Sequence, residues 1–283
     1  NPEDYTNRGS IITPLKDRID SQILTHYPRS LDIGVEITKQ EAWAERDGVT
    51  VHVPHIYREI VEQVAFEARA SEYVDQKSGV SARLTRAALE DLISAAERRA
   101  LLNDESETTI RASDLQAIEP AVTGKVELVY EGEQEGAQGV ARALIGKAIA
   151  STVKRYLPDP GEKSDTGTGR DAYSAVLRWF SQGKTVELDP EMPFDAYAKT
   201  LDGVDGLGAI IDAHTSPASP AEKASMMELA LEVLHQHSLL GKDLEADAAT
   251  YADMVGSVLS GLGSFGSDDD DEDYGEDDYR RYG

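Results

Sequence analysis

Two stretches of the chain carry apolar residues at helical spacing, with polar residues between them. The first follows Pro54 and places an apolar residue at every fourth position, at Ile56, Ile60, Val64 and Ala68. Since proline is favoured at the first position of a helix, this pattern predicts a core-facing helix from 54 to about 73. The second stripe follows Ser81, a favourable N-cap, and consists of Leu84, Ala88, Leu92 and Ala96. It predicts a helix over 82–102.

Weaker patterns of the same kind predict further helices. They cover 31–44, 113–123, 138–156, 171–181, 194–200, 207–213, 219–240 and 244–259. The best marked begins at Ser219-Pro220 with Glu222, which combines an N-cap, a first-turn proline and a capping box. Strand-like runs are confined to 21–27, which ends at Pro28, and to 185–188. Residues 126–136 alternate briefly, either as a strand or as a strand-like entry into the helix at 138. The chain is therefore predicted to be mainly α-helical.

Composition divides the chain at two places. Residues 158–169 read PDPGEKSDTGTG and predict a linker at 158–170, between helical regions at 31–157 and 171–262. From 263 to 283 Gly, Ser, Asp and Tyr dominate, and an acidic, disordered tail is expected because no apolar face could offset the entropy of ordering. The opening Asn1-Pro2-Glu3-Asp4 is typical of a strand end that turns into a loop. We therefore expect the sequence to enter a domain partway through, with 1–30 as the last piece of that domain.

The net charge of the chain narrows the range of functions to be considered. The formal net charge is −25, of which the tail supplies −7, so the body alone carries about −18. A negative field of this size repels phosphate backbones, and direct nucleic-acid binding is not expected. No run approaches the ~18 apolar residues that a membrane helix needs, so no membrane association is expected. The chain has no cysteine, which fits a reducing, cytoplasmic location.

The familiar catalytic motifs are missing from these residues. The stretch nearest to a phosphate-binding loop, 178–185 (RWFSQGKT), has Arg where the first glycine is required and follows a predicted helix instead of a strand. The six histidines are scattered, and His235 and His237 are two apart on a predicted helix, so no metal ligands are identified. No Ser, His and Asp stand in a nucleophile-elbow context.

Two arginines are candidates for anion binding. Arg83 falls in the first turn of a predicted helix, where free N–H groups and the helix dipole favour an anion. Arg18 follows Asp17, which could hold it extended. From these residues alone, an ordinary surface arginine on a solvated, charged face is the more common interpretation of each.

Taken together, these stretches resemble AAA+ ATPases of the magnesium chelatase and MoxR branch. Asn1-Pro2-Glu3, then Leu15-Lys16-Asp17-Arg18 and a short strand ending at Pro28, are similar to the sensor 1 and arginine-finger segment of that family. The stretch Gly79-Val80-Ser81-Ala82-Arg83-Leu84 is similar to the Gly-x-Ser-Pro-Arg that opens the sensor 2 helix of MoxR proteins. Ile19 replaces the usual Phe, Ala82 replaces the proline, and chelatases tend to place the arginine at the position of Ser81. The resemblance covers 1–103, extends loosely over 111–157, and leaves the C-terminal half unassigned.

The resemblance implies a role for each motif. Asn1 would orient the attacking water, Arg18 would be the arginine finger for a neighbouring subunit's ATP, and Arg83 would contact the nucleotide from the lid; Arg8 is the runner-up for the finger. Residues 1–30 would be the C-terminal edge of the α/β nucleotide domain, 31–157 the helical lid with sensor 2, and 171–262 a helical C-terminal extension. In this family the Walker A and B motifs that bind ATP and Mg²⁺ precede sensor 1, so the intact protein would bind both, and this chain alone would be inactive.

The same resemblance implies a homo-oligomeric ring, expected to be a hexamer, that remodels or inserts a metal into a partner carrying a von Willebrand A domain. Two alternatives remain open. The chain could be a non-enzymatic helical adaptor whose arginines make only surface pairs. It could also belong to a transcription-regulator AAA+ subunit, although the negative body disfavours contact with DNA.

Overall fold

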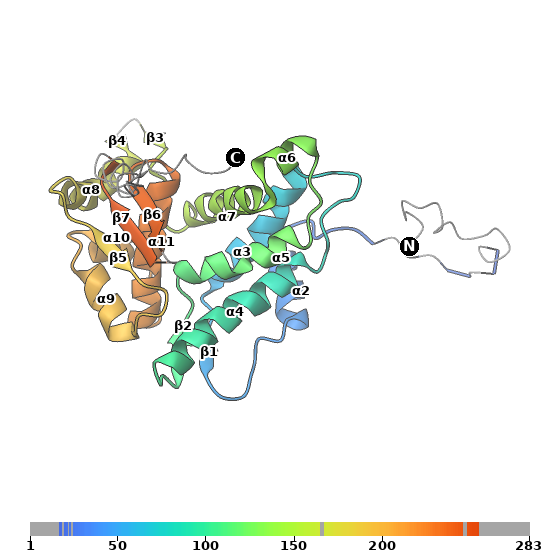
Figure 1. Cartoon of the computed structure of the whole chain (residues 1–283), viewed down its shortest axis with the longest axis horizontal. Coiled ribbons are helices and arrows are strands. Elements are labelled where there is room, and N and C mark those ends of the chain that lie inside the picture. Colours follow the sequence, from blue (N-terminus) through green and yellow to red (C-terminus); the bar gives the residue numbers. More distant parts are fainter. Residues whose placement is uncertain are drawn as a thin grey trace, which may run out of the picture.

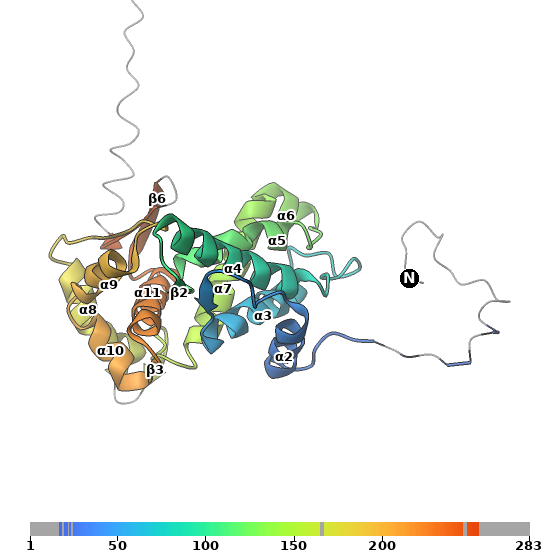
Figure 2. The ribbon, with the colours of Figure 1, turned by 90° about the horizontal axis from the view of Figure 1, so that it is seen from below.

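The computed structural model describes residues 17, 18, 20, 21, 23, 25–164, 167–245 and 248–254. Within them the protein is mainly helical, as predicted. Figure 1 shows two groups of elements: helices α2–α6 on one side, and α8–α11 with the strands β5–β7 on the other, with α7 lying between them. In both views α2 and the group α8–α10 lie toward opposite ends of the molecule (Figure 2). No helix in the described ranges is both long and apolar enough to cross a membrane.

The first group, here called the helical body, is built around α3 and α4. Its helices are α2 (Leu31–Glu41), α3 (His55–Ala70), α4 (Leu84–Leu102), the 3-10 helix η1 (Ser113–Ile118), α5 (Glu119–Thr123), α6 (Tyr130–Glu135) and α7 (Ala137–Val153). Both predicted apolar stripes are buried, since Ile60, Val64, Leu84 and Leu92 are completely inaccessible to solvent. Two short parallel strands, β1 (Thr50–His52) and β2 (Glu107–Thr109), lie beside the C-terminal end of α4.

The second group, here called the C-terminal group, combines helices with a small sheet. Its elements are β3 (Lys163–Ser164), β4 (Gly167–Thr168), the 3-10 helix η2 (Gly169–Tyr173), α8 (Ser174–Phe180), β5 (Val186–Leu188), α9 (Phe194–Asp202), α10 (Leu207–His214), α11 (Pro220–Gln236), β6 (Gly241–Glu245) and β7 (Ala248–Ala252). The sheet is antiparallel, with strand order β5–β7–β6. The N-cap and first-turn proline predicted for α11 are confirmed, because Ser219 Oγ accepts from Glu222 N at 3.1 Å and Pro220 is the first residue of the helix. Glu222 Oε2 reaches back to the N–H of Ala218 at 2.8 Å, one residue before the N-cap.

Buried apolar side chains continue from one group into the other as a single cluster that runs from Ile56 to Tyr251. The proline- and glycine-rich segment between the groups forms the hairpin β3–β4 and the start of η2. The Tyr173 hydroxyl donates to Pro158 O at 2.8 Å, and a side chain at Gly169 would collide with Asp159 O. The segment at 158–170 thus folds back on itself, while the domain boundary placed there stays a prediction.

Two expectations from the sequence are wrong. The helix expected over 244–259 is replaced at its start by the hairpin β6–β7, in which Ala249 and Tyr251 are buried in alternation with half-exposed neighbours. The C-terminal extension is therefore mixed α and β. The strand expected over 21–27 is not formed by the described residues of that range, since strands need hydrogen-bonded neighbours and none lies beside them there.

Of the two alternatives for 126–136, the structure shows the strand-like entry into a helix. Val126 and Leu128 form isolated bridges with Val80 and Val74, and α6 follows at Tyr130. The N–H of Ser113, the first residue of η1, donates to Glu228 of α11, a residue distant in the sequence.

Candidate functional site

Arg83 stands at the N-terminal end of α4, in the cap position just before Leu84. Ser81, the predicted N-cap, accepts from Arg83 N through Oγ at 3.3 Å, and its carbonyl accepts from Leu84 N at 3.0 Å. The side chain of Arg83 is exposed, and its guanidinium has no hydrogen-bond or ion-pair partner in the described part of the chain. In a protein with so many carboxylates, this leaves a free cation at the positive end of a helix dipole.

The loop that delivers Arg83 is held by its own hydrogen bonds. Asp75 accepts from Lys77 N at 2.9 Å and from Ser78 Oγ at 2.8 Å, and its carbonyl accepts from Gly79 N at 3.0 Å. These hydrogen bonds lower the pKa of Asp75. Gly79 has a φ of +71°, a left-handed conformation that favours glycine. The path from α3 to α4 is therefore a defined turn.

A buried acid lies beneath this end of α4. Glu62 of α3 is almost inaccessible to solvent and accepts a short hydrogen bond from the hydroxyl of Thr38 in α2. The Thr38 and Thr85 hydroxyls are 2.8 Å apart, so Glu62 and the two threonines link α2, α3 and α4. Burial raises the pKa of Glu62, while the two hydroxyls oppose this shift. Gly34 allows the approach, because a Cβ there would lie 2.4 Å from Glu62 Oε2.

The other residues that the resemblance singled out are not brought to Arg83. Arg18 lies in a turn with Asp17, is exposed, and has no contact with Arg83 in the described part of the chain. Asn1 and Arg8 lie outside the described residues. The structure thus supplies a local geometry for Arg83 and none for a complete catalytic centre.

A second polar cluster lies at the opposite end of α4, and the sequence reasoning missed it. Arg99 is 1% exposed, pairs closely with Asp114 of η1 and donates to Thr109 O at 2.9 Å. The second oxygen of Asp114 accepts from Arg111 N at 2.7 Å. Burial raises the pKa of Asp114, an effect that Arg99 opposes. Arg99 and Asp114 together fasten α4 to η1.

Glu228 of α11 extends this cluster into the C-terminal group. Its oxygens accept from Ala112 N at 2.9 Å, from Ser113 N at 3.0 Å and from the Tyr197 hydroxyl at 2.7 Å. Burial raises the pKa of Glu228, and the Tyr197 hydrogen bond opposes the shift. Two acids four residues apart in the otherwise apolar run of α11, Glu228 and Glu232, were the available signal for a buried polar contact.

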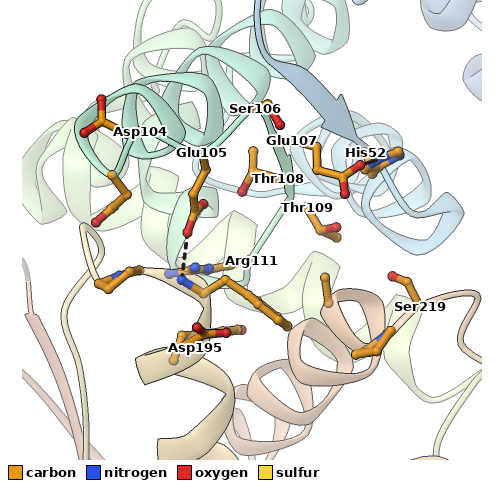
Figure 3. A pocket seen from close by; sticks show the side chains of 16 residues that line it. His52, Asp104, Glu105, Ser106, Glu107, Thr108, Thr109, Arg111, Asp195 and Ser219 are labelled. Carbon is orange, nitrogen blue, oxygen red and sulfur yellow. Dashed lines mark hydrogen bonds and ion pairs between the residues drawn. The ribbon is translucent and has the colours of Figure 1, made fainter.

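A cleft of about 700 Å³ opens beside this cluster, between β2 and the beginnings of α9 and α11. Figure 3 shows Glu105, Arg111 and Asp195 around it, with Glu105 bonded to the N–H of Phe194 at 2.9 Å. Arg111 donates to Met192 O at 2.7 Å and its guanidinium lies 4.0 Å from the Tyr197 ring centre. Glu105 and Arg111 thus both hold the segment 191–194 against the helical body.

The described lining residues of the cleft do not form a Ser–His pair. His52 lies 3.3 Å from Glu107, and Ser219 Oγ caps α11, so no serine is paired with a histidine among its described lining residues. In the described ranges, no three His, Asp or Glu side chains gather in a way that could hold a metal ion.

Comparison with protein-family models, with curated proteins and with solved structures found no match to this chain.

Proposed function

We propose that this chain is the lid-bearing, C-terminal part of a AAA+ ATPase of the magnesium chelatase and MoxR type. The observation that carries the proposal is the placement of Arg83, exposed and unpaired at the beginning of the long helix α4. The order and spacing of the Asn1-Pro2-Glu3, Asp17-Arg18 and Gly79-to-Leu84 motifs support it.

The chemistry of Arg83 suits a phosphate. A guanidinium offers a planar set of N–H donors that matches phosphate oxygens, and a helix N-terminus adds backbone N–H groups and a positive potential. An exposed arginine in a chain with net charge −25 has many carboxylates available, yet Arg83 is paired with none among the described residues. A ligand from another domain could therefore bind it without breaking an existing contact.

In the proposed enzyme, ATP lies between this lid and the rest of the nucleotide domain. Arg83 contacts its phosphates from the same subunit, whereas Arg18 reaches the ATP of a neighbour in the ring, expected to be a hexamer, and neutralises charge that develops in the transition state. Asn1 orients the attacking water. Mg²⁺ would be held with ATP by the Walker A and B motifs, which precede sensor 1 in the family that the chain resembles.

Lid motion driven by ATP would act on a partner protein. The proposed partner carries a von Willebrand A domain, and the outcome is remodelling or metal insertion in the cytoplasm. The negative charge of the body disfavours DNA as the target, so a transcription-regulator subunit is the weaker candidate.

The coding sequence gives the first test. The proposal expects a G-x-x-x-x-G-K-[ST] motif and an acidic strand end about 50–130 residues upstream of Asn1 in the same reading frame. A start codon immediately before Asn1, with no such motif, would favour the helical adaptor instead.

Turnover by the intact protein gives the second test. Replacing Arg18 by Ala should lower the rate of ATP hydrolysis by about 10³-fold or more while leaving ATP binding nearly intact, because a finger acts on the transition state. Arg83→Ala should weaken ATP binding as well. Arg178→Ala is the matched control, because Arg178 is an exposed arginine on α8 and should not affect either step.

Mixed rings separate action on a neighbour from action within one subunit. Arg18→Ala subunits retain Arg83, and Arg83→Ala subunits retain Arg18, so some interfaces of a mixed ring contain both arginines. Partial recovery of turnover on mixing is expected if Arg18 serves a neighbour's ATP. Turnover no higher than that of the two separate variants would contradict the finger assignment.

A further inference from the structure

The hydroxyl of Tyr27 binds both backbone groups of one distant residue. It donates to Val80 O at 2.7 Å and accepts from Val80 N at 3.0 Å. A single phenol thus uses its donor and an acceptor lone pair on the residue three positions before Arg83. We infer that Tyr27 is a positioning residue for Arg83, a role that rests on the function proposed above.

The contact is specific because the loop is shaped around it. A Cβ built on Gly79 would lie 2.8 Å from the Tyr27 hydroxyl oxygen, and the backbone there has a φ of +71°. Any side chain at 79 would therefore strain the turn and displace the hydroxyl. On its other side, Val80 forms an isolated bridge with Val126, so its backbone is held from two directions.

The ring of Tyr27 is held by an arginine and not by burial. Tyr27 as a whole is 42% exposed, so packing alone does not fix the ring. The guanidinium of Arg69, in the last turn of α3, lies 4.1 Å from the ring centre. Nε and Nη1 of Arg69 are buried and form no hydrogen bond with the described residues. The guanidinium instead contacts two aromatic rings, that of Tyr27 and, at 5.3 Å, that of Phe66.

Tyr27 connects two segments that the proposed enzyme must align. It lies shortly after Arg18 and directly before Pro28 and Ser30, the N-cap of α2. Val80 leads through Ser81 to Arg83. The hydroxyl therefore ties the segment that enters the lid to the turn that presents Arg83, and it limits the positions Arg83 can take toward bound phosphate.

The test removes the hydroxyl and keeps the ring. In the intact protein, Tyr27→Phe should raise the KM for ATP about five- to tenfold with kcat changed less than twofold, as expected from the loss of modest hydrogen bonds that position a binding group. Tyr130→Phe is the matched control, because Tyr130 is exposed and its hydroxyl has no partner among the described residues. The KM of that variant should equal the wild-type value.

A double-mutant cycle distinguishes positioning from general loosening. If Tyr27 acts through Arg83, Tyr27→Phe should cause no further rise in KM once Arg83 is alanine. If Tyr27→Phe raised the KM for ATP by the same factor in the wild type and in Arg83→Ala, the inference would be overturned.

Hydrogen exchange on this chain tests the contact without ATP. The amide of Val80 should exchange about tenfold faster in Tyr27→Phe, with exchange near Arg99 unchanged. Unchanged exchange at Val80 in an active ATPase would overturn the positioning role alone. A wild-type protein that does not hydrolyse ATP would overturn the proposed function, and the role of Tyr27 toward ATP with it, even if Val80 responds.

Discussion

The two ends of α4 use arginine in opposite ways. At its beginning Arg83 is exposed and unpaired within the described chain, beside a turn held by Tyr27 and Asp75. Near its other end Arg99 is buried, paired with Asp114 and bonded to Thr109 O. A buried charge is tolerated only when its partners are in place, whereas an exposed free charge costs little and can be used by a ligand. The contrast separates residues that maintain the fold from a residue available for function.

The buried end also explains how the two groups of elements are joined. Glu228 of α11 binds two backbone N–H groups just before η1, and the Tyr57 hydroxyl of α3 lies 2.7 Å from Ser225 Oγ of α11. Ser225 in turn donates to Ile110 O at 2.7 Å. These bonds sit within the continuous apolar cluster, so movement of the proposed lid would carry the C-terminal group with it.

The largest effect is expected from Arg99. Arg99→Met keeps much of the side-chain volume but leaves Asp114 buried without its cation, which should lower the free energy of unfolding by about 3–5 kcal/mol. Urea denaturation of the whole chain measures this loss of unfolding free energy. Arg98→Met is the control from the next position, because Arg98 is exposed and its pair with Glu191 at 2.6 Å is a surface contact expected to contribute less than about 1 kcal/mol. If Arg98→Met lowered the free energy of unfolding as much as Arg99→Met, the burial of Arg99 would not explain its contribution to stability.

Two glutamates on α11 should respond to pH with opposite signs. Burial raises the pKa of Glu228. Burial would also raise the pKa of Glu232, but Lys242 at 2.6 Å and the Tyr251 hydroxyl at 2.8 Å outweigh it and lower that pKa below its usual 4.5. A group whose pKa is raised in the folded state stabilises the fold at pH values below its unfolded-state pKa. This contribution is lost as the pH rises through the folded-state pKa. A lowered pKa stabilises the fold above the unfolded-state value, and this contribution is lost as the pH falls.

The advantage of the wild type over Glu232→Gln should therefore shrink as the pH falls below 4.5. Its advantage over Glu228→Gln should grow as the pH falls toward 4.5 and should be complete below that value. The expected change is about 1.4 kcal/mol for each unit of pKa shift. Unfolding free energies measured by urea at several pH values give both trends. Glu187→Gln, at an exposed position of β5, reports the effect of losing a surface carboxylate. Trends of the same sign for Glu228 and Glu232 would contradict the opposite pKa shifts assigned to these two side chains.

The long helices could be predicted from the sequence because their apolar stripes and caps are local signals. Pro54 and Ser219-Pro220 mark the starts of α3 and α11 within one residue. The hairpin β6–β7 could not be predicted, since an alanine-rich run with Leu244 and Tyr251 fits a helical period as well as an alternating one. Its strand character depends on pairing with β5, which is distant in the sequence.

The candidate site was predictable in part for the same reason. Arg83 follows a local Gly-x-Ser pattern, and its place at the start of a helix is confirmed. Tyr27 carries no such signal, because its partner Val80 is 53 residues away. The two bonds of Glu228 to backbone N–H groups join residues more than 100 positions apart, so only the unusual acid in an apolar helix indicated them. The roles of Asn1 and Arg18 stay predictions.

The smallest effect on stability is expected at Arg83, where the comparison becomes sharpest. Arg83→Ala removes an exposed side chain without a partner in the described chain, so the free energy of unfolding should change by no more than about 0.5 kcal/mol. Urea denaturation beside Arg99→Met provides the measurement. A loss of about 2 kcal/mol or more would show that Arg83 has a structural partner, and would remove the reason for assigning it to a ligand. If Arg83→Ala left the stability unchanged but weakened ATP binding in the intact protein, the two ends of α4 would differ in function. An arginine would then be dispensable for folding at position 83 and required for it at position 99.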